Sequence, residues 1–531
     1  MNRKLLLLLA ALFSGVLLSC SSESNEPDDG GQTGKPELFT KRYNSDQSFY
    51  SKLLAQEMKY SVLLPQQYLS ESTGKYGVVY LLHGWGGDQN SWGPSGLNIQ
   101  SIADAQEGKG TVRPLIYVLL QGFNSYFCNR YDGGFNYMDM LMNELVPLID
   151  KRFRTTANKQ ERAIVGFSMG GFGALNVASQ HPEAFSVSVG LSPSLNTDEQ
   201  YITLSADGWN QQWGNTFGGS GQTGTARLTS YYKSQCPLHF FDDKASSSFQ
   251  SIRYYIDCGD DEERLYSGNG ALHSLLRDKG IKHEYRVRNG AHTDSYWRES
   301  MKEVLPFIES AFKGQSYPQE TLKTFTEELY ATSRIVRVNS TDIELWTPAD
   351  YDAGLAYSVL YYSKGEGNAN LTARQVAQAL DSLMQVKRMV IAGFDAKEVV
   401  QQNISFPAIT SVVEQIIHTE GTSGARLGLA YGSHADYLYD CATGDAPAIG
   451  FFFAEDADIT HLSAVNSARL YYLDTTDDGT HYDRMLALFN RLRDVEAPVQ
   501  YRVRNGKDTS SSAQTGIYSM SSFIGEQLIK K

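Results

Sequence analysis

One hexapeptide occurs twice in this chain of 531 residues, and this repeat limits the possible folds more than any other feature. Residues 285–290 read YRVRNG, and residues 501–506 have the same six letters. The similarity extends upstream, where 253–257 (RYYID) corresponds to 470–474 (LYYLD). Such identity is not expected by chance between unrelated segments, and internal similarity indicates a repeated architecture. We therefore predict two copies of one fold.

The two copies are expected at residues 40–313 and 330–531, with the polar segment 314–329 as the connector. In the first copy, apolar runs such as 78–82 and 115–120 alternate with helical patterns. This alternation predicts an α/β fold in each copy, with a mainly parallel sheet and helices on both faces. Each copy is long enough to bury a core of its own.

The first residues of the chain have the pattern of an export signal. Two basic residues precede an apolar run at 5–18, which is too short to span a bilayer but has the length of a signal-peptide core. The run ends in LLSC, which resembles the cleavage motif of bacterial lipoproteins. We expect removal of 1–19, lipidation of Cys20 and a flexible acidic tether at 20–39. The expected location is the outer membrane, at the cell surface or the periplasmic face.

Charge and cysteine content exclude two broad classes of protein. Lys and Arg number 47 and Asp and Glu number 60, which gives a formal net charge of -13. An acidic chain lacks the positive surface that non-specific nucleic-acid binding requires, so we expect no nucleic-acid partner. Five cysteines in so long a chain exclude a disulfide scaffold. Membrane association is expected only through a lipid on Cys20.

Residues 166–171 (GFSMGG) are the clearest indication of chemistry. They follow the apolar run 163–165 and begin a helical pattern. A strand, a G-x-S-x-G motif and a helix in this order form a nucleophile elbow, which holds a serine at a tight turn on the sheet edge. The turn leaves no room for a Cβ atom at Gly166 or Gly170. We predict that Ser168 is a catalytic nucleophile.

A serine nucleophile requires a base and a carboxylate that orients the base. The candidate base is His292, in a loop after the predicted strand 284–288, because the chain order in α/β-hydrolases is Ser, acid, His. The acid is expected in the turn 258–263, after the predicted strand 254–257. Spacing alone does not decide among the four carboxylates of this turn, which are Asp260, Asp261, Glu262 and Glu263.

The turn at 83–87 (HGWGG) follows the predicted strand 78–82. In a fold of this kind it supplies one backbone N–H of an oxyanion hole, expected at Trp85, and the residue after the nucleophile, Met169, supplies the other. His83 precedes the nucleophile in the chain, so we interpret it as a residue that packs against the turn and orients it.

Together these segments resemble the esterase-D-like α/β-hydrolases, and within them carbohydrate esterase family one, which includes feruloyl and acetyl-xylan esterases. The similarity rests on LLHG at 81–84, the elbow at 166–171, DCG at 257–259 and GAHT at 290–293 with YWR at 296–298 after it. It covers nearly all of the first copy. The resemblance implies an α/β-hydrolase fold and a serine mechanism that needs no metal and no cofactor.

The resemblance also ranks the candidate acids. The family position, three residues after Gly259, holds Glu262, which we rank first. Asp261 is ranked second and requires a shift of one residue, whereas an alignment with one extra residue selects Glu263. Asp294 stands where the family often has Trp, so the acyl or leaving-group pocket is expected to differ.

The second copy has lost the groups that carry the chemistry. Gly432 stands at the nucleophile position, Asp508 at the histidine position and Gly479 at the acid position. The HG turn is replaced by SK at 363–364. We therefore predict that this copy is catalytically degenerate. Its Asp-rich turn at 474–483 matches no calcium-loop spacing and is interpreted as a remnant of the acid turn, so no metal site is expected.

The leading functional hypothesis is a serine esterase that removes feruloyl or acetyl groups from plant cell-wall polysaccharide such as xylan, or from its oligosaccharides. One alternative is a non-catalytic, glycan-binding surface lipoprotein built on a hydrolase scaffold. Another is an esterase that acts on a siderophore ester or a thioester. The segment 196–248 is rich in Gly, Ser and aromatic residues and is expected to form part of the substrate cleft.

Overall fold

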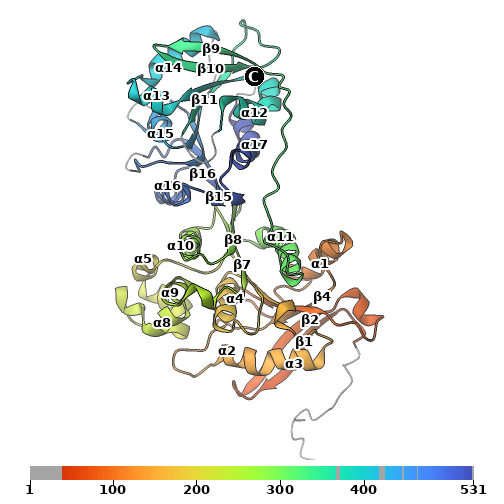
Figure 1. Cartoon of the computed structure of the whole chain (residues 1–531). Coiled ribbons are helices and arrows are strands. Elements are labelled where there is room, and N and C mark those ends of the chain that lie inside the picture. Colours follow the sequence, from red (N-terminus) through yellow and green to blue (C-terminus); the bar gives the residue numbers. More distant parts are fainter. Residues whose placement is uncertain (1–38, 366–370, 418–424, 445–447, 463–464, 529–531) are drawn as a thin grey trace, which may run out of the picture. The chain divides into compact units, whose positions relative to one another are not determined.

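The computed structural model describes residues 39–365, 371–417, 425–444, 448–462 and 465–528 (Figure 1). The predicted signal peptide, Cys20 and all of the tether except Phe39 lie outside these residues. Residues 39–531 form one compact unit. Among the described residues, no helix combines the length and the hydrophobicity needed to cross a membrane.

The described strands join into a single 16-stranded sheet. They are β1 (Tyr43–Ser51), β2 (Gln56–Leu63), β3 (Gly77–Leu82), β4 (Leu115–Leu120), β5 (Arg162–Phe167), β6 (Val187–Leu191), β7 (Arg253–Gly259), β8 (His283–Arg288), β9 (Thr332–Val338), β10 (Thr341–Thr347), β11 (Ser358–Lys364), β12 (Met389–Asp395), β13 (Arg426–Gly432), β14 (Phe451–Ala457), β15 (Leu470–Asp478) and β16 (Val499–Lys507).

The order of the strands repeats. The first eight lie in the order β1-β2-β4-β3-β5-β6-β7-β8, and the second eight in the order β9-β10-β12-β11-β13-β14-β15-β16. Within each set, all pairs are parallel except those made by the first two strands. The predicted fold class, a mainly parallel α/β sheet of α/β-hydrolase type, is confirmed.

Helices cover both faces of this sheet (Figure 1). They are α1 (Ile99–Gly108), α2 (Tyr137–Met140), α3 (Val146–Arg152), α4 (Met169–Gln180), α5 (Asp198–Thr203), α6 (Ala206–Trp209), α7 (Asn215–Phe217), α8 (Ser230–Gln235), α9 (Pro237–Asp243), α10 (Leu265–Asp278), α11 (Asp294–Phe312), α12 (Ala373–Lys387), α13 (Ala396–Gln401), α14 (Phe406–Ile416), α15 (Asp436–Thr443), α16 (Tyr482–Asp494) and α17 (Ser510–Gln527). We call β1 to α11 the N-terminal half and β9 to α17 the C-terminal half.

The central strands are buried on both faces, which explains why they read as continuous apolar runs. In β3, Val78 and Tyr80 pack in the hydrophobic cluster that includes α2, α3 and α4. Val79 and Leu81 point to the opposite face and pack with α1 and α11. Side chains of a strand alternate between the two faces of its sheet, so one short run supplies both layers of the core.

The two halves meet at β8 and β16, which pair antiparallel. Val287 of β8 lies opposite Val503 of β16, its counterpart in the repeat. A residue opposite its own counterpart is typical of a two-fold, isologous interface, here formed within one chain. The pairing removes two exposed strand edges. One hydrophobic cluster, which includes both valines, continues through the two halves, whereas on the other face each half has a separate cluster.

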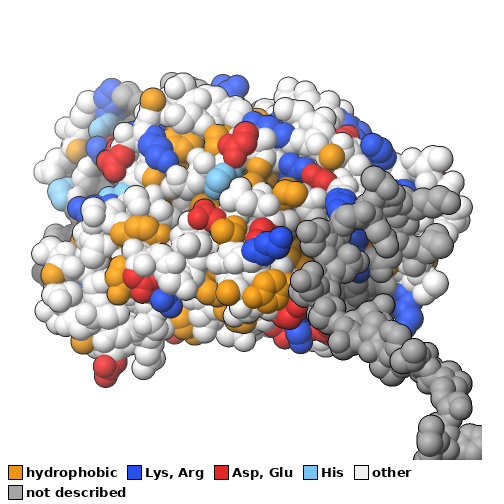
Figure 2. Space-filling view, turned by 90° about the horizontal axis from the view of Figure 1, so that it is seen from below, with side chains coloured by type: hydrophobic (Ala, Val, Ile, Leu, Met, Phe, Trp, Pro, Cys, Tyr) orange, Lys and Arg blue, Asp and Glu red, His pale blue; other side chains and the backbone are white. Residues whose placement is uncertain are grey.

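The surface has no obvious segregation of charge on the face drawn in Figure 2, where acidic and basic side chains are interspersed with hydrophobic ones. The four cysteines within the described residues are free thiols, and three of them are buried. Core packing and hydrogen bonds, rather than disulfides, therefore hold this part of the chain together.

Candidate active site

Ser168 lies at the tight turn between β5 and α4. Its backbone has φ 56° and ψ -122°, a region that costs a non-glycine residue about 1–3 kcal/mol unless its surroundings hold it. They do so here, because the Ser168 N–H donates to the carbonyl of Leu191 at 2.8 Å and the Ser168 carbonyl accepts from the N–H of Ser194 at 2.9 Å. The strand, turn and helix expected of a nucleophile elbow are all present.

Two glycines make this turn possible. A Cβ atom on Gly166 would lie 2.1 Å from the carbonyl oxygen of Gly170, and one on Gly170 would lie 2.4 Å from the carbonyl oxygen of Leu82. Backbone atoms at such distances cannot yield without moving a strand or a helix. The G-x-S-x-G spacing is therefore a steric requirement of this packing.

His292 lies in the loop between β8 and α11, with its two ring nitrogens between a hydroxyl and a carboxylate. Its Nε2 is 2.9 Å from Ser168 Oγ, and its Nδ1 is 2.9 Å from Glu262 Oε2. A carboxylate beside Nδ1 favours the tautomer that carries its proton there, which leaves Nε2 free to accept the proton of the serine hydroxyl. The edge of the ring meets Trp297 at 4.8 Å between centroids.

Glu262 is buried, and its second oxygen is also bound. Glu262 Oε1 accepts the N–H of Gly259 at 2.9 Å and the hydroxyl of Ser192. Ser192 Oγ accepts the indole N–H of Trp297 at 2.9 Å. Each carboxylate oxygen has a defined partner, so the orientation of the group toward His292 is set by its surroundings.

The other carboxylates of the turn do not reach the histidine. Asp261, the second-ranked candidate, is half-exposed and faces Arg493 of α16 at 3.3 Å. Asp260 is buried but bonds to Arg502 of β16 at 2.6 Å, and Glu263 is exposed. The geometry brings only Glu262 to His292, because successive side chains leave this tight turn in different directions.

The two amides expected to form an oxyanion hole flank the nucleophile. Gly84 packs on the elbow, since a Cβ atom there would lie 3.3 Å from Ser168 Cβ. This contact places the turn that contains Trp85 beside Ser168. Neither the N–H of Trp85 nor that of Met169 has a backbone or side-chain acceptor among the described residues. Met169 begins α4, so its N–H also lies at the positive end of the helix dipole.

His83 has a supporting place in the structure. It is buried, its Nδ1 lies 2.6 Å from the carbonyl oxygen of Gly84, and its Nε2 accepts the N–H of Gly122 at 2.9 Å. Burial lowers the pKa of this histidine, which favours the neutral ring that these two bonds require. It thus ties the turn after β3 to the turn after β4, as the sequence interpretation expected.

Aromatic side chains line the loops at the same edge of the sheet. Trp85, Phe123 and Tyr131 are 40%, 41% and 50% exposed, which is unusual for rings of this size. The Trp85 ring lies 6.2 Å from that of Tyr126, which is buried and packs against Trp213 and against Phe217 of α7. The segment 196–248 thus packs beside the candidate site, where the cleft was expected.

Sequence reasoning missed Ser192, which follows β6 and binds Glu262. Its only sequence signal is its place after the strand next to β5, at the edge where parallel strands present functional groups. Its φ of 44° marks it as a conformationally unusual position, but this is visible only in the structure. Trp297 was part of the resemblance, but its bond to Ser192 was not foreseen.

The C-terminal half keeps the backbone of the site without its reactive groups. Gly432 ends β13 with φ 61°, close to the φ of Ser168. Asp508 accepts the hydroxyl of Thr480 at 2.9 Å, and Gly479 stands where the acid would be. Among the described residues of the chain, no group of three or more His, Cys, Asp or Glu side chains could hold a metal ion.

Comparison with known proteins shows what the region around this site is similar to. Residues 51–308 match the model of the family described as "Putative esterase". The matched range contains Ser168, Glu262 and His292, and we call it the esterase domain after the description of the model that it resembles.

Several relatives are similar to the esterase domain. An endo-1,4-beta-xylanase/feruloyl esterase of Xylanibacter ruminicola is 28% identical over 277 residues, which are 50% of this chain and 31% of that protein. An acetyl esterase of Caldicellulosiruptor saccharolyticus is 23% identical over 279 residues, which are 51% of this chain and 96% of that protein. A solved ferulic acid esterase is 24% identical with a TM-score of 0.44, covering 51% of this chain and 100% of that structure. The chain thus spans less than a third of the first of these relatives.

Proposed function

We propose that the esterase domain is a serine carboxylic-ester hydrolase that removes feruloyl or acetyl groups from plant cell-wall polysaccharide such as xylan, or from its oligosaccharides. The observation that carries the proposal is the hydrogen-bonded series Ser168, His292 and Glu262, with 2.9 Å at both contacts of the histidine. A hydroxyl, an imidazole and a buried carboxylate in this order can activate the hydroxyl as a nucleophile.

In the acylation step, Ser168 Oγ attacks the ester carbonyl while His292 Nε2 takes its proton. The carbonyl oxygen becomes an anion, and the N–H groups of Trp85 and Met169 are the donors proposed to hold it. Glu262 stabilises the imidazolium through Nδ1. His292 then gives the proton to the leaving alkoxide, and the sugar hydroxyl departs, leaving the acyl group on Ser168.

Deacylation uses the same groups in the reverse order. A water molecule beside His292 loses its proton to Nε2 and attacks the acyl carbonyl, and the anion again forms beside the two amides. The proton returns to Ser168 Oγ as the carboxylic acid leaves. Each proton transfer therefore uses one histidine nitrogen, while the other stays bound to Glu262.

Two observations support an acylated glycan as substrate. Relatives that align with the esterase domain are named for feruloyl and acetyl ester hydrolysis. The exposed rings of Trp85, Phe123 and Tyr131 lie in loops at the same edge of the sheet as Ser168, and such rings suit an aryl group or a sugar ring. The loops that carry Trp85 and Phe123 are held together by a bond from Gly86 N–H to Asn124 at 2.8 Å.

We also propose that a lipid on Cys20 holds the enzyme at the outer membrane. This rests on the sequence of residues 1–20 alone. A Cys20→Ala variant should lose incorporation of labelled palmitate and leave the membrane fraction. A variant that stays in the membrane fraction would contradict the anchor.

The activity test compares wild type with Ser168→Ala on methyl ferulate and on acetylated xylan. Wild type should release ferulate, acetate or both, and the variant should lose turnover by a factor on the order of 10⁶ if the three residues act as a unit. The substrate that wild type hydrolyses faster identifies the acyl group that the enzyme prefers. Near-wild-type turnover in Ser168→Ala would contradict the proposed mechanism.

A further inference from the structure

Asp260 lies two residues before Glu262 and links three segments of the chain. It is 1% exposed, although aspartate is rarely buried without partners. Its Oδ1 accepts the N–H of Gly290 at 3.0 Å, in the loop that leads to His292. Its Oδ2 accepts the N–H of Tyr501 at 3.0 Å and Arg502 Nη1 at 2.6 Å, and both donors belong to β16 of the C-terminal half.

Backbone bonds make this junction stiff. The Asp260 N–H donates to the carbonyl of Arg288 at 3.0 Å, and the Asp261 N–H donates to the carbonyl of Gly290 at 2.9 Å. A Cβ atom on Gly259 would lie 2.2 Å from the carbonyl oxygen of Gly290, so the turn with the acid and the loop with the histidine touch directly. A displacement of Asp260 would therefore move both loops.

The carboxylate of Asp260 depends on its cationic partner. Burial raises the pKa of Asp260, and the charge of Arg502 opposes that effect. Breaking a buried ion pair by removing one partner leaves an uncompensated charge, which either takes up a proton or moves toward water. Either response loosens the carboxylate that holds Gly290 N–H.

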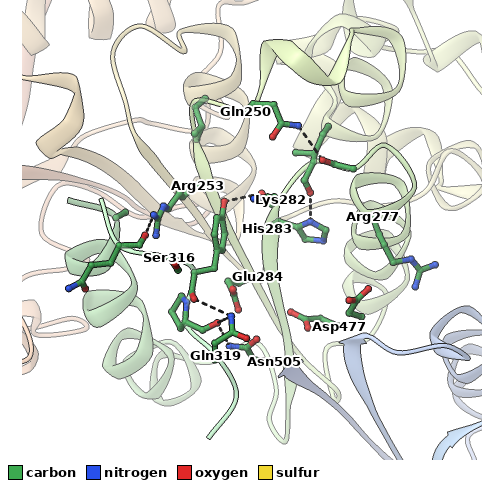
Figure 3. A pocket seen from close by; sticks show the side chains of 18 of the residues that line it. Gln250, Arg253, Arg277, Lys282, His283, Glu284, Ser316, Gln319, Asp477 and Asn505 are labelled. Carbon is green, nitrogen blue, oxygen red and sulfur yellow. Dashed lines mark hydrogen bonds between the residues drawn. The ribbon is translucent and has the colours of Figure 1, made fainter. Parts of the chain in front are cut away.

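The C-terminal half contains the corresponding junction, with Asp477 in the place of Asp260. Asp477 accepts the N–H of Gly506 at 2.8 Å on one oxygen, and on the other accepts the N–H of Tyr285 at 3.4 Å and Arg286 Nη1 at 3.1 Å. Figure 3 shows Asp477 at a cavity of about 870 Å³ whose wall also includes His283 and Glu284 of β8. Across the same interface, Arg286 thus supports a loop without a catalytic acid, and Arg502 supports the loop with Glu262.

We propose that Arg502 is a positioning residue of the esterase, so that the C-terminal half completes the active site of the N-terminal half. Through Asp260, Arg502 holds the acid turn and the histidine loop in the register that lets Glu262 meet His292. The degenerate half thus has a role in catalysis without any reactive group of its own. This inference rests on the proposed esterase function.

The test compares Arg502→Met with Arg286→Met in the full chain, on p-nitrophenyl acetate. Arg502→Met removes the ion pair with Asp260, whereas Arg286→Met removes the counterpart with Asp477 together with ion pairs to Glu284 and Glu303. Arg286→Met should therefore lower the melting temperature at least as much as Arg502→Met. Arg502→Met should lower kcat by about 30- to 100-fold with KM within about threefold of wild type, because small displacements of catalytic groups have effects of this size. Arg286→Met should keep kcat within about twofold. Arg502→Lys, which keeps the charge, should recover part of the lost kcat.

Equal kcat values in the two methionine variants would overturn the proposal, as would wild-type kcat in Arg502→Met. If Arg502→Met does not fold, Asp260→Asn and its mirror variant Asp477→Asn replace the pair, and only Asp260→Asn should lower kcat. Wild type and Ser168→Ala are measured in the same series. Absence of Ser168-dependent turnover in wild type would refute the esterase function itself, whereas normal wild-type turnover with unaffected Arg502 variants refutes only the role of Arg502.

Discussion

The indole N–H of Trp297 donates to the hydroxyl oxygen of Ser192 at 2.9 Å. Ser192 in turn donates its own proton to Glu262, so a tryptophan of α11 directs a hydroxyl after β6 toward the carboxylate that faces His292. The ring of Trp297 also stacks on Phe167 at 4.3 Å between centroids. The candidate acid is thus held by a series of bonds that begins at the helix directly after the histidine loop.

Trp297→Phe tests this series because it keeps an aromatic ring against Phe167 and removes only the indole donor. A hydrogen bond that orients a charged group contributes about 1.5–3 kcal/mol, so kcat/KM should fall by about 10- to 100-fold. Ser192→Ala should have a similar effect. The double variant should be little worse than either single variant, because both changes interrupt one series of bonds. Fully additive losses in steady-state kinetics would show that the two residues act separately.

Substitution of Glu262 and of the adjacent Asp261 tests which of the two carboxylates is the triad acid. Glu262→Gln should lower kcat by a factor on the order of 10⁴, because the amide favours the wrong tautomer of His292. Asp261→Asn should stay within about threefold of wild type, since Asp261 faces Arg493 and is half-exposed. Initial rates on p-nitrophenyl acetate measure both. A large loss in Asp261→Asn with little change in Glu262→Gln would reassign the acid.

A buried histidine pair should make stability depend on pH. His283 Nε2 lies 2.7 Å from His273 Nδ1, and His283 Nδ1 lies 2.8 Å from the carbonyl oxygen of Ile281. Burial lowers the pKa of His283 to about 4, whereas an unfolded histidine titrates near about 6.5. The unfolded chain therefore binds protons first as the pH falls. Stability that is present above pH ~6.5 is lost as the pH falls toward ~4.

His283→Gln removes this dependence at one site, because glutamine does not titrate. Urea unfolding at pH 7 and at about pH 4.5 should show that wild type loses about 2 kcal/mol more than the variant between the two conditions. Groups that do not contact His283 titrate in both proteins and cancel in the difference, whereas the pKa of His273 depends in part on His283. An identical loss in both proteins would mean that folding does not lower the pKa of His283.

The isologous interface predicts the behaviour of the N-terminal half alone. A fragment that ends near Lys313 would expose the edge of β8, and a second copy of the fragment would offer the same YRVRNG segment that β16 offers in the full chain. We expect the fragment to dimerise through β8, with Arg286 of one copy beside Asp260 of the other. Sedimentation velocity should show the dimer, and specific activity should rise with fragment concentration. A fragment that is monomeric and fully active at every concentration would contradict this expectation.

Local sequence patterns predicted much of this protein. The strands of the N-terminal half were expected close to their observed positions. The apolar run at 185–189 also has the pattern of a strand, but β6 begins only at Val187. Phe185 is buried against Tyr80 at 6.0 Å between ring centroids, so its hydrophobicity reflects core packing rather than strand. An apolar run indicates burial, and residues just before a strand can be buried as well as the strand itself.

Sequence patterns did not decide which carboxylate is the candidate acid. Four carboxylates stand in succession after β7, and the resemblance ranked Glu262 above Asp261 without a physical reason for the choice. The structure supplies that reason, because the partners of each carboxylate come from different parts of the chain. Ser192 binds Glu262, whereas Arg493 and Arg502 draw Asp261 and Asp260 toward the other half.

Local sequence patterns are sufficient to predict the repeat, the mainly parallel α/β class and the serine at its elbow. These follow from identity between segments, from the period of the apolar residues and from the space that glycine leaves at a tight turn, all of which act over a few residues. Two features are visible only in the three-dimensional structure: Glu262 is the carboxylate that faces His292, and β8 pairs with β16 with Val287 opposite Val503. Both depend on side chains far apart in the sequence, such as Asp260 and Arg502 at a separation of 242 residues, and such contacts exist only when the whole sheet has formed.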